Sequence, residues 1–523
     1  MNKSENDQLF DEILAARERV YALGDATPLQ PLEVSGSSCE VWVKREDLGP
    51  IKAYKWRGAY NAMAALTEAQ RDKGIVTASA GNHAQGVALA ANELNCRAII
   101  YMPRATPEVK RSEVQRIGAH MVEIRLVGDS YDEAAEAAAL YCEQRGGVYV
   151  HPYDDLMVMG GQGTLADEVV MSGCGPFDRV YVAIGGGGLA AALSCWLKKY
   201  WPKVKIYGVE GIDQASMSEA LEAGEPVRLD YVDVFCDGTA VRKVGVNTYK
   251  YCSKLLDGML KVSNDDVCHA IRSLWESARI IPEPSGAMSL AGFQKHSAEG
   301  SVETGAKVLC IVSGANMDFA QLGAIAHRAG IGSKHRRFLR VPIPQGRGTL
   351  VSFLSQLPRE ISIIDLQYGM IDSDVQYPVL GLIGSDQDYC DLDEVLDQRG
   401  VSANDVSTDE DVDYRIINYA AERFSFPLFV NIEFPERAGS LLQFMEEVKD
   451  LASLCYFNYA YSGERVGRAL VGMEFDTEKA RHICLEQIMS MPASDGGCIR
   501  AVREVSDETF LRLTGRIRNS PTS

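Results

Sequence analysis

Several features that mark specialised classes of protein are absent from this sequence. No apolar run approaches the roughly 20 residues that a membrane helix needs, so a membrane-spanning protein is not expected. Basic residues are outnumbered, with 53 lysines and arginines against 72 acidic residues and a net charge of −19, which disfavours binding to a nucleic-acid backbone. Residues 1–7 contain neither a basic region nor an apolar stretch, so we expect no signal peptide.

Paired cysteines and metal-binding spacings are also lacking. The 13 cysteines are an odd number without a Cys-x-x-Cys pair, and the 8 histidines show no His-x-x-x-His spacing. A disulfide framework would pair its cysteines, whereas scattered ones are typical of small buried residues in a reducing compartment. We therefore expect a cytoplasmic protein with no metal site.

What is present is a long chain of ordinary composition, with 523 residues of which 46% are hydrophobic and 24% charged. This length predicts about two to four domains. From about residue 38 to 330, short β-branched segments alternate with alanine-rich stretches, and this alternation favours parallel sheets with helices on both faces. The clearest examples are a helix-like stretch at 131–145, a strand-like one at 179–184 and the helix-like stretch 189–201 that follows it.

The region after about residue 330 contains an internal repeat. Residues 91 positions apart match, as in Leu350 with Leu441, Phe353 with Phe444, Gln367-Tyr368 with Asn458-Tyr459, and Gly381 with Gly472. Such self-similarity indicates two copies of one structural unit. Each copy is predicted to begin with a strand and an amphipathic helix and to continue with two further strands.

Four short motifs in the first region supply the groups that one cofactor requires. Lys55 comes first, and the motifs at 79–83, 185–189 and 313–316 follow it along the chain. Together they offer an amine for an aldehyde, donors for a phenolate oxygen, a cradle for a phosphate and a partner for a pyridine nitrogen. Pyridoxal phosphate carries all of these groups, so we predict that it is the cofactor.

The glycine tract at 185–188 lies between a predicted strand and a predicted helix. Residues without Cβ let backbone N–H groups surround an anion, and a helix N-terminus favours negative charge. A dinucleotide-binding fingerprint is the alternative. The Gly-x-Gly-x-x-Gly spacing is missing because Leu189-Ala190-Ala191 follows directly, although Glu210 at the end of the next strand comes close to the expected acidic residue. The tract therefore favours the phosphate cradle.

These motifs, in this order, resemble those of the fold-type II pyridoxal-phosphate enzymes, and most closely those of the biosynthetic threonine dehydratases. The resemblance spans roughly residues 20 to 500. It implies an α/β catalytic domain of two open, twisted parallel-sheet subdomains, followed by two ferredoxin-like α+β domains of the ACT-like regulatory type. The expected ranges are 1–325 for the catalytic domain, 326–336 for a linker, 337–408 for the first regulatory domain, 409–426 for a second linker and 427–502 for the second regulatory domain.

The resemblance also implies a role for each motif. Lys55 is expected to hold the cofactor as a Schiff base and then to act as the general base. Asn82 is expected to contact the 3′-oxygen of the cofactor and Ser313 its pyridine nitrogen, with Glu283 in a supporting role. The phosphate is assigned to Gly185, Gly186, Gly187, Gly188 and Leu189, and the substrate carboxylate to Ser79, Ala80, Gly81, Asn82 and His83.

The implied activity is that of a threonine ammonia-lyase, which converts L-threonine to 2-oxobutanoate and ammonia at the start of isoleucine synthesis, with L-serine as a further substrate. The same resemblance implies a homotetramer that isoleucine inhibits and valine can oppose. The candidate effector residues are Gln367, Tyr368, Asn458 and Tyr459. The alternative for the two tyrosines is that they pack between strand and helix, and Gly369 and Ala460 stand where the family often has arginine.

Two other functions stay open at this point. A serine dehydratase or serine racemase would use the same catalytic motifs, although the short enzymes of that kind lack two regulatory modules. An amino-acid sensor with a decayed catalytic domain is the second, and the intact Lys55, Asn82 and Ser313 argue against it. Glu210 and Asp213 are interpreted as surface charges and not as a cation site, and the motif 161–164 is expected to shape the fold.

Overall fold

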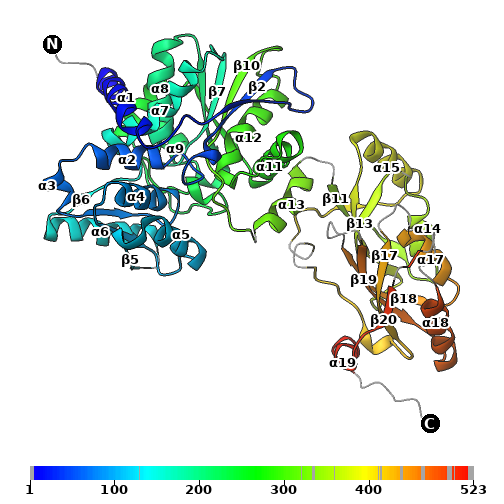
Figure 1. Cartoon of the computed structure of the whole chain (residues 1–523). Helices are drawn as coiled ribbons and strands as arrows, with labels where there is room; N and C mark the ends of the chain where they lie inside the picture. Colours follow the sequence, from blue (N-terminus) through cyan, green and yellow to red (C-terminus); the bar gives the residue numbers. More distant parts are fainter. Residues whose placement is uncertain are drawn as a thin grey trace. The chain divides into compact units, whose positions relative to one another are not determined.

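The computed structural model divides the chain into two compact units, Met1–Gly332 and Ser333–Ser523. In Figure 1 the first unit runs from blue to green and the second from yellow-green to red. The structure describes residues 5–128, 130–319, 321–332, 336–358, 360–409, 412, 415–435, 440–460, 466–491, 498–499 and 501–515. In this part of the chain, no helix combines the length and the apolar character that crossing a membrane would require.

The larger lobe of the first unit is built on a six-stranded sheet in which every pairing except β1 with β2 is parallel. Its strands, in spatial order, are β1 (Leu29–Leu32), β2 (Glu40–Arg45), β10 (Lys307–Val312), β7 (Arg179–Ala183), β8 (Lys205–Gly211) and β9 (Gly258–Val262). The central strand β10 is almost continuously apolar because helices cover both of its faces. Leu309 and Ile311 pack into one core, and Val308, Cys310 and Val312 pack into the other.

Two sets of helices cover these faces. The first core is closed by α1 (Glu5–Tyr21), α7 (Leu156–Met171), α8 (Gly188–Tyr200), α9 (Ser216–Ala223) and α10 (Val246–Leu255). The second is closed by α11 (Asn264–Ala278), α12 (Pro284–Ala298) and α13 (Gln321–Gly332). Because Ile325 and Ala329 of α13 are buried in this second core, the first unit continues past the expected boundary at residue 325 to Gly332.

The smaller lobe is an insertion with a four-stranded parallel sheet of its own. Its strands are β5 (Val122–Leu126), β4 (Ala98–Met102), β3 (Ile75–Ala78) and β6 (Val148–Tyr149) in spatial order. The helices are α2 (Trp56–Ala64), α3 (Glu68–Arg71), α4 (Asn82–Glu93), α5 (Glu108–Gly118) and α6 (Tyr131–Arg145). One core lies under α2, α4 and α5, and a second lies under α6. The expected two parallel-sheet subdomains are confirmed.

The second unit contains a continuous eight-stranded antiparallel sheet. Its strands, in spatial order, are β16 (Asn404–Asp405), β11 (Arg336–Arg340), β15 (Val379–Ile383), β13 (Ser362–Gly369), β18 (Ser453–Ala460), β19 (Val466–Glu474), β17 (Leu428–Pro435) and β20 (Ala501–Glu504). A separate short pair joins β12 (Ile343–Pro344) to β14 (Val375–Gln376). The helices are α14 (Thr349–Leu354), α15 (Asp386–Gln398), α17 (Ser440–Val448), α18 (Glu478–Ser490) and α19 (Asp507–Thr514).

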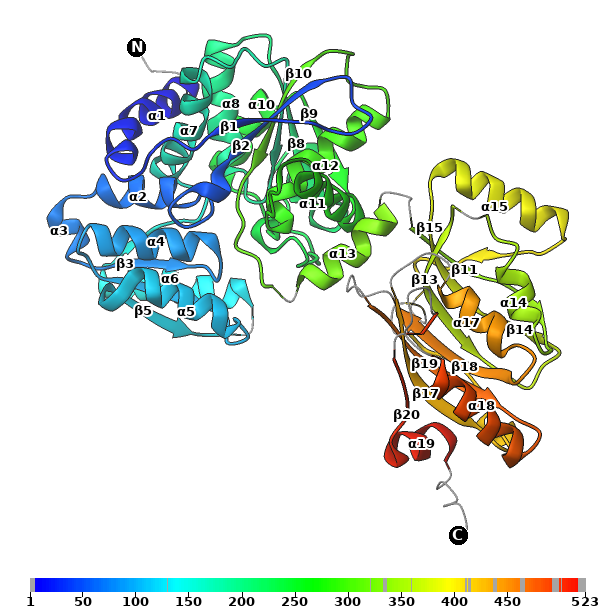
Figure 2. The same cartoon turned by 45° about the vertical axis from the view of Figure 1, so that its right-hand side comes forward.

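The predicted repeat is present in this sheet. Each copy runs β–α–β–β–α–β, with α14 and α15 in the first and α17 and α18 in the second, and Figure 2 shows these four helices on one side of the sheet. Leu350 and Leu441 lie at equivalent places in one shared core. The central strands β13 and β18 pair with each other and join the two copies. Parts of both expected linkers, at 333–335, 410–411 and 413–414, lie outside the described residues.

Helix α1 buries one stripe of its side chains. Leu9, Ile13 and Val20 are fully buried, whereas Leu14 is 48% exposed. A helix that lies on the surface of a sheet buries one stripe, and Leu14 falls outside that stripe.

Candidate functional site

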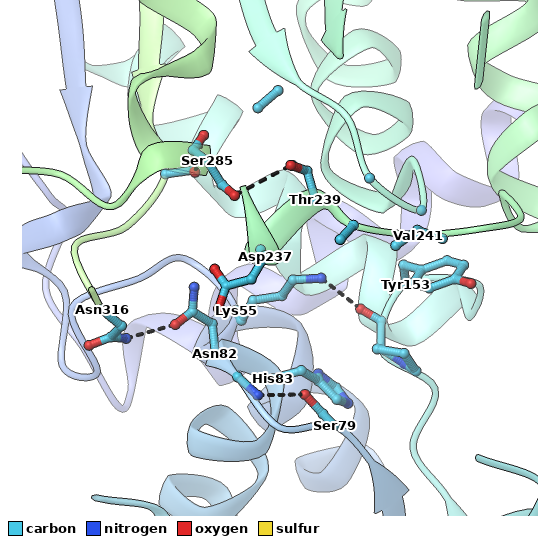
Figure 3. Close-up of a pocket in the computed structure, with 18 of the residues that line it drawn as sticks. Lys55, Ser79, Asn82, His83, Tyr153, Asp237, Thr239, Val241, Ser285 and Asn316 are labelled. Carbon is cyan, nitrogen blue, oxygen red and sulfur yellow. Dashed lines mark hydrogen bonds between the residues drawn. The ribbon is translucent and has the colours of Figure 1, made fainter. Parts of the chain in front are cut away.

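A pocket lies between the two lobes of the first unit, and its cavity has a volume of about 350 Å³. This is the size range of small-ligand sites. Figure 3 shows its polar residues converging from both lobes. The cavity is lined by every residue that the sequence assigned to cofactor or substrate in this unit, namely Lys55, Ser79, Ala80, Gly81, Asn82, His83, Gly185, Gly186, Gly187, Gly188, Leu189, Glu283 and Ser313.

Lys55 enters the pocket from the start of helix α2, where it occupies the N-cap position. Its Nζ donates a hydrogen bond of 3.0 Å to the backbone oxygen of Pro152. Burial lowers the pKa of this amine to about 8, against the opposing effect of Glu283. The neighbouring Arg57 guanidinium does not face this amine, because it is bound to the carboxylates of Glu46 and Glu168.

The segment 79–83 leads from strand β3 into helix α4, so the free N–H groups of the first helical turn face the cavity. The Gly81 N–H donates to Ser79 Oγ at 3.3 Å, which holds the turn. His83 is buried, with Nε2 at 3.2 Å from the Val150 oxygen. Burial and the nearby Lys55 lower the pKa of His83 to about 3, so the ring is neutral at physiological pH. A helix N-terminus beside a neutral ring suits a carboxylate.

Asn82 belongs to a chain of side-chain amides and a carboxyl group. Its Nδ2 donates to Glu283 Oε1 at 2.8 Å, and its Oδ1 accepts from Asn316 Nδ2 at 2.8 Å. The same Asn316 amide also donates to the Ile51 oxygen. Since Nδ2 carries two protons, Asn82 keeps one donor for an acceptor in the cavity. Burial, and then Asp237, raise the pKa of Glu283 to about 8.

The glycine tract 185–188 leaves little or no room for side chains. A Cβ on Gly186 would lie 2.2 Å from the ring of Tyr153, and one on Gly188 would lie 2.9 Å from the Tyr153 backbone oxygen. Gly187 has a φ of +93°, which favours glycine. Helix α8 begins at Gly188, so its first N–H groups have no partner within the helix. This geometry fits a phosphate.

Ser313 follows strand β10 and completes the set with a hydroxyl group. Its Oγ lies 3.4 Å from the Ser285 oxygen, a long contact that leaves the hydroxyl available to a ligand. A buried amine, a neutral hydroxyl, an amide donor and an anion cradle therefore meet in one cavity. These are the groups that pyridoxal phosphate needs, so the residues present fit this cofactor.

Sequence reasoning missed several pocket residues. Tyr153 packs against the glycine tract, and Lys110 forms an ion pair with Asp237 at the pocket. The position of Tyr153 four residues after the end of β6 was a usable signal, because binding residues gather at the carboxyl ends of parallel strands. Lys110 and Asp237 gave no such signal, since they lie 127 positions apart.

Glu210 differs from its expected role. It is fully buried and not a surface charge, and its carboxylate accepts hydrogen bonds from the backbone N–H groups of Met217 and Ser218 at the start of α9. Asp213 is exposed, as expected. Glu210 therefore anchors a helix. Among the described residues, no cluster of three or more histidine, cysteine or acidic side chains could hold a metal ion.

The candidate effector residues separate into two groups. Gln367 and Asn458 are direct partners across β13 and β18. Tyr368 is buried in the core beneath the helices, and Tyr459 packs against that core. Because neighbouring residues of a strand face opposite sides, the two polar side chains lie on the other face of the sheet. On that face Arg415, which lies in the segment between the two copies, forms an ion pair with Asp365 and donates a hydrogen bond to the Asn458 side chain.

Comparison with known proteins agrees with this geometry. Residues 21–314 match the family model described as pyridoxal-phosphate dependent enzyme. Residues 427–494 match the model described as the C-terminal regulatory domain of threonine dehydratase. The second match runs from β17 past the end of α18, so it covers the second copy of the repeat except β20.

Individual relatives extend the similarity over most of the chain. The biosynthetic L-threonine dehydratase of Escherichia coli is 37% identical over 88% of this chain and 89% of its own length. Among solved structures, processed threonine deaminase isoform 2 of Solanum lycopersicum is 39% identical with a TM-score of 0.60, covering 63% of this chain and 95% of that one. Maize serine racemase is 28% identical with a TM-score of 0.55, covering 62% of this chain and 98% of that one.

Proposed function

Because the chain belongs to the biosynthetic threonine dehydratases, a family of pyridoxal-phosphate-dependent enzymes, we propose that it deaminates L-threonine to 2-oxobutanoate and ammonia. It is a pyridoxal-phosphate-dependent lyase with a C-terminal regulatory domain. The observation that carries the proposal is the single cavity in which Lys55, Asn82, the glycine tract and Ser313 meet. L-serine, which differs by one methyl group, is the second substrate we propose.

Each side chain has a task in this reaction. When bound, pyridoxal phosphate supplies an aldehyde that condenses with amines and a ring that withdraws electrons from the α-carbon. With a pKa of about 8, Lys55 has enough unprotonated amine near neutral pH to attack a carbonyl and to take a proton from the α-carbon. The first turn of α4 holds the substrate carboxylate, and α8 with the tract 185–188 holds the phosphate.

Ser313 and Glu283 adjust the site and do not react. A serine hydroxyl next to the pyridine nitrogen does not stabilise a protonated ring as a carboxylate would. Electron withdrawal is then weaker, which favours prompt loss of the β-hydroxyl over transamination. Glu283 fixes the orientation of the Asn82 amide through their 2.8 Å hydrogen bond, so the second N–H of Asn82 would be available to hold an oxygen of the cofactor.

Serine racemase is the alternative within the same fold. The match to the maize enzyme uses 62% of this chain and already accounts for 98% of the maize enzyme. The maize enzyme therefore has no counterpart of the second unit. The matched regulatory model lies in that second unit. The regulatory architecture therefore favours the dehydratase.

For the second unit we propose binding of an amino-acid effector, with isoleucine as inhibitor and valine as its opponent. The polar pair of Gln367 and Asn458, with Asp365 and Arg415 beside it, can bind both charges of an amino acid. Tyr368 is buried and Tyr459 is half-buried against the same core, which supports a packing role for both. We further propose a cytoplasmic homotetramer, which size-exclusion chromatography with light scattering tests.

One assay tests the proposal as a whole. Steady-state formation of 2-oxo acids is measured with L-threonine and with L-serine, in the absence and presence of isoleucine. Faster turnover of threonine with inhibition by isoleucine is the expected result. Conversion of L-serine to D-serine without oxo-acid formation would assign the chain to the racemases instead.

A further inference from the structure

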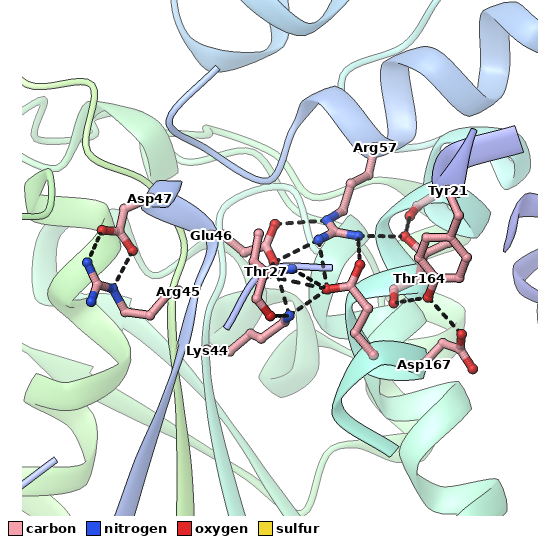
Figure 4. A network of polar contacts seen from close by, with 11 residues as sticks. Tyr21, Thr27, Lys44, Arg45, Glu46, Asp47, Arg57, Thr164 and Asp167 are labelled. Atoms are coloured by element: carbon pink, nitrogen blue, oxygen red, sulfur yellow. Dashed lines mark hydrogen bonds and ion pairs between the residues drawn. The ribbon is translucent and has the colours of Figure 1, made fainter. Parts of the chain in front are cut away.

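A group of four charged side chains is buried beside the pocket without lining it. Lys44, Glu46 and Arg57 have no exposed surface, and Glu168 is 6% exposed. We call these four residues the ion cluster. Figure 4 labels Lys44, Glu46 and Arg57 together with Thr27 and Thr164. None of the four residues of the ion cluster is among those that line the cavity. The ion cluster contains two cations and two carboxylates, so its formal charge is balanced.

Arg57 is at the centre of the ion cluster, and all five of its N–H groups are used. Nε and Nη2 donate to Glu46 at 2.8 and 3.1 Å, and Nη1 and Nη2 donate to Glu168 at 2.5 and 3.0 Å. The remaining Nη1 proton is donated to Thr164 Oγ1 at 3.1 Å. A planar fork with five fixed donors matches two carboxylates in this way, and a lysine ammonium does not.

Lys44 completes the arrangement from strand β2. Its Nζ donates to Glu168 at 2.5 Å and to the Thr27 oxygen at 2.5 Å. Removing four charges from water costs several kcal/mol for each ion, and replacing such groups with apolar side chains is often neutral or stabilising. A gain in folding stability therefore does not explain the ion cluster. A need to hold the neighbouring backbone in one fixed geometry does.

The ion cluster holds both ends of the segment that carries Lys55. Glu46 and Arg57 are 11 positions apart, and their pairing closes the segment 46–57 into a loop. Lys55 lies two residues before one end of this loop. Glu168 attaches the closed end to α7, and a Cβ on Gly161 of α7 would lie 2.3 Å from the Arg57 backbone oxygen. Helix α4 also packs closely on another side, since a Cβ on Gly86 would lie 3.1 Å from the Lys55 oxygen.

We propose that the ion cluster is a positioning device for Lys55, in which the Glu46–Arg57 pair closes the loop and Glu168 fixes it to α7. The proposal rests on the function assigned to Lys55 above. It also gives a role to Gly161 and Thr164, which the sequence indicated only as shaping the fold. A displacement of about 1 Å at a reacting group can lower a rate by about 100-fold. Loss of the ion cluster should therefore reduce kcat and cofactor attachment more than it reduces substrate binding.

The first experiment compares Arg57→Lys with Arg45→Lys in the full-length enzyme. Arg45 forms a bidentate pair with Asp47 at 2.9 and 2.7 Å, also with little exposure, but this pair spans two residues and closes no loop. Two quantities are measured well below the melting temperature: kcat and KM for threonine, and the fraction of chains with cofactor fixed to Lys55 by borohydride reduction and peptide mapping. We expect Arg57→Lys to lose about 100-fold in kcat with KM within about threefold. Arg45→Lys should stay within about twofold in kcat.

Two charge-balanced double variants separate positioning from general stability. Lys44→Met/Glu168→Gln keeps the Glu46–Arg57 pair that closes the loop. Lys44→Met/Glu46→Gln also removes one positive and one negative charge but breaks that pair. The two should have similar melting temperatures. The first weakens only the attachment to α7, so it should keep clearly more of the cofactor attachment and kcat than the second, which also opens the loop. Equal kcat and equal attachment in the two double variants would overturn the proposal.

A separate variant keeps this test distinct from the test of the proposed function. If Lys55→Ala retains activity, the assignment of Lys55 itself is wrong. If Lys55→Ala is inactive and Arg57→Lys has wild-type kcat and attachment, the function stands and the ion cluster is only structural.

Discussion

The two units of this chain differ in how they use charge. The first unit buries Lys44, Glu46, Arg57, Glu210 and Glu283, all of them with partners around or beside one cavity. Among the described residues of the second unit, Asp365 is the only charged side chain that is buried. Reactivity requires groups whose pKa is shifted by removal from water, and each such group needs a partner. Recognition of an effector requires polar groups on the face of a sheet, but it does not require charged side chains buried in the interior.

This difference predicts that chemistry and regulation can be damaged separately. Substitutions in the first unit should abolish turnover and leave effector binding in place. Changes in the second unit should remove the response to amino acids and leave turnover. The following four experiments test this separation in order of decreasing effect.

The largest effect is expected from Lys55→Ala. Loss of general-base assistance alone lowers a rate by roughly 10²–10⁴-fold, and loss of covalent attachment to the cofactor adds to that. Turnover of threonine is measured together with isoleucine binding by calorimetry, which should be unchanged. Lys73→Ala, at an exposed lysine of the same lobe, is the control. Activity above a few per cent of wild type would contradict the assignment.

The next effect is expected from Gly187→Asp. A Cβ there would lie 2.8 Å from Met217 and 3.0 Å from Thr248, and a carboxylate would repel the phosphate. Cofactor content per purified chain, measured by absorbance, should collapse while circular dichroism is unchanged. Gly36→Asp is a matched control, because Gly36 also has a positive φ but has no atom within 4 Å of its Cβ position. An equal loss of cofactor in the two variants would show that backbone strain alone is responsible.

A smaller effect is expected from removing the second unit after Gly332. The cut is placed there because α13 belongs to the core of the first unit. The shortened enzyme should keep its kcat and lose its response to isoleucine, a coupling that is typically about 5–150-fold in affinity. Inhibition curves for both forms are the measurement. Persistent inhibition of the shortened form would place the effector site in the first unit. It would contradict the separation of chemistry and regulation between the two units.

The smallest effect concerns the pH dependence of stability. Burial and Asp237 raise the pKa of Glu283 to about 8 from its ordinary 4.5. Between pH 4.5 and pH 8, the Glu283 carboxyl is therefore protonated in the folded chain and ionised in the unfolded chain. Glu283 therefore contributes stability that is fully present below about pH 4.5 and is lost as pH rises towards 8, by about 1.4 kcal/mol per pH unit. Urea unfolding of wild type and Glu283→Gln at pH 5.5 and 7.5 measures this slope, which the variant should lack. Equal slopes would refute it.

How much of the site the sequence predicted depends on the distance between partners along the chain. The tract 185–188 and the segment 79–83 each combine a strand end with a helix start, and such local order can be read from residue types. The contact of Arg57 with Glu168 joins residues 111 positions apart, and nothing in either neighbourhood indicates it. Contacts of this kind are set by how α2 and α7 pack, so they appear only when the fold is known.

The effector residues illustrate a second limit. The 91-residue offset correctly aligned β13 with β18, because repeats preserve the order of apolar and glycine positions. The face that each side chain occupies was not deduced. Alternation along a strand sends Gln367 and Tyr368 to opposite sides, and a β-bulge between Ile363 and Asp365 interrupts the count before them. Pattern alone thus identified the strands and not the binding face.

The pairing of β13 with β18 has a consequence for the solubility of the two copies. In a single copy, either strand would be an edge of eight residues with unpaired N–H and C=O groups, which other chains can pair with. Within the described sheet each strand covers the other, and the strands left at the two edges, β16 and β20, have only two and four residues. Duplication therefore protects both copies from edge-to-edge aggregation, and half of this unit expressed alone should self-associate through the strand that its partner normally covers.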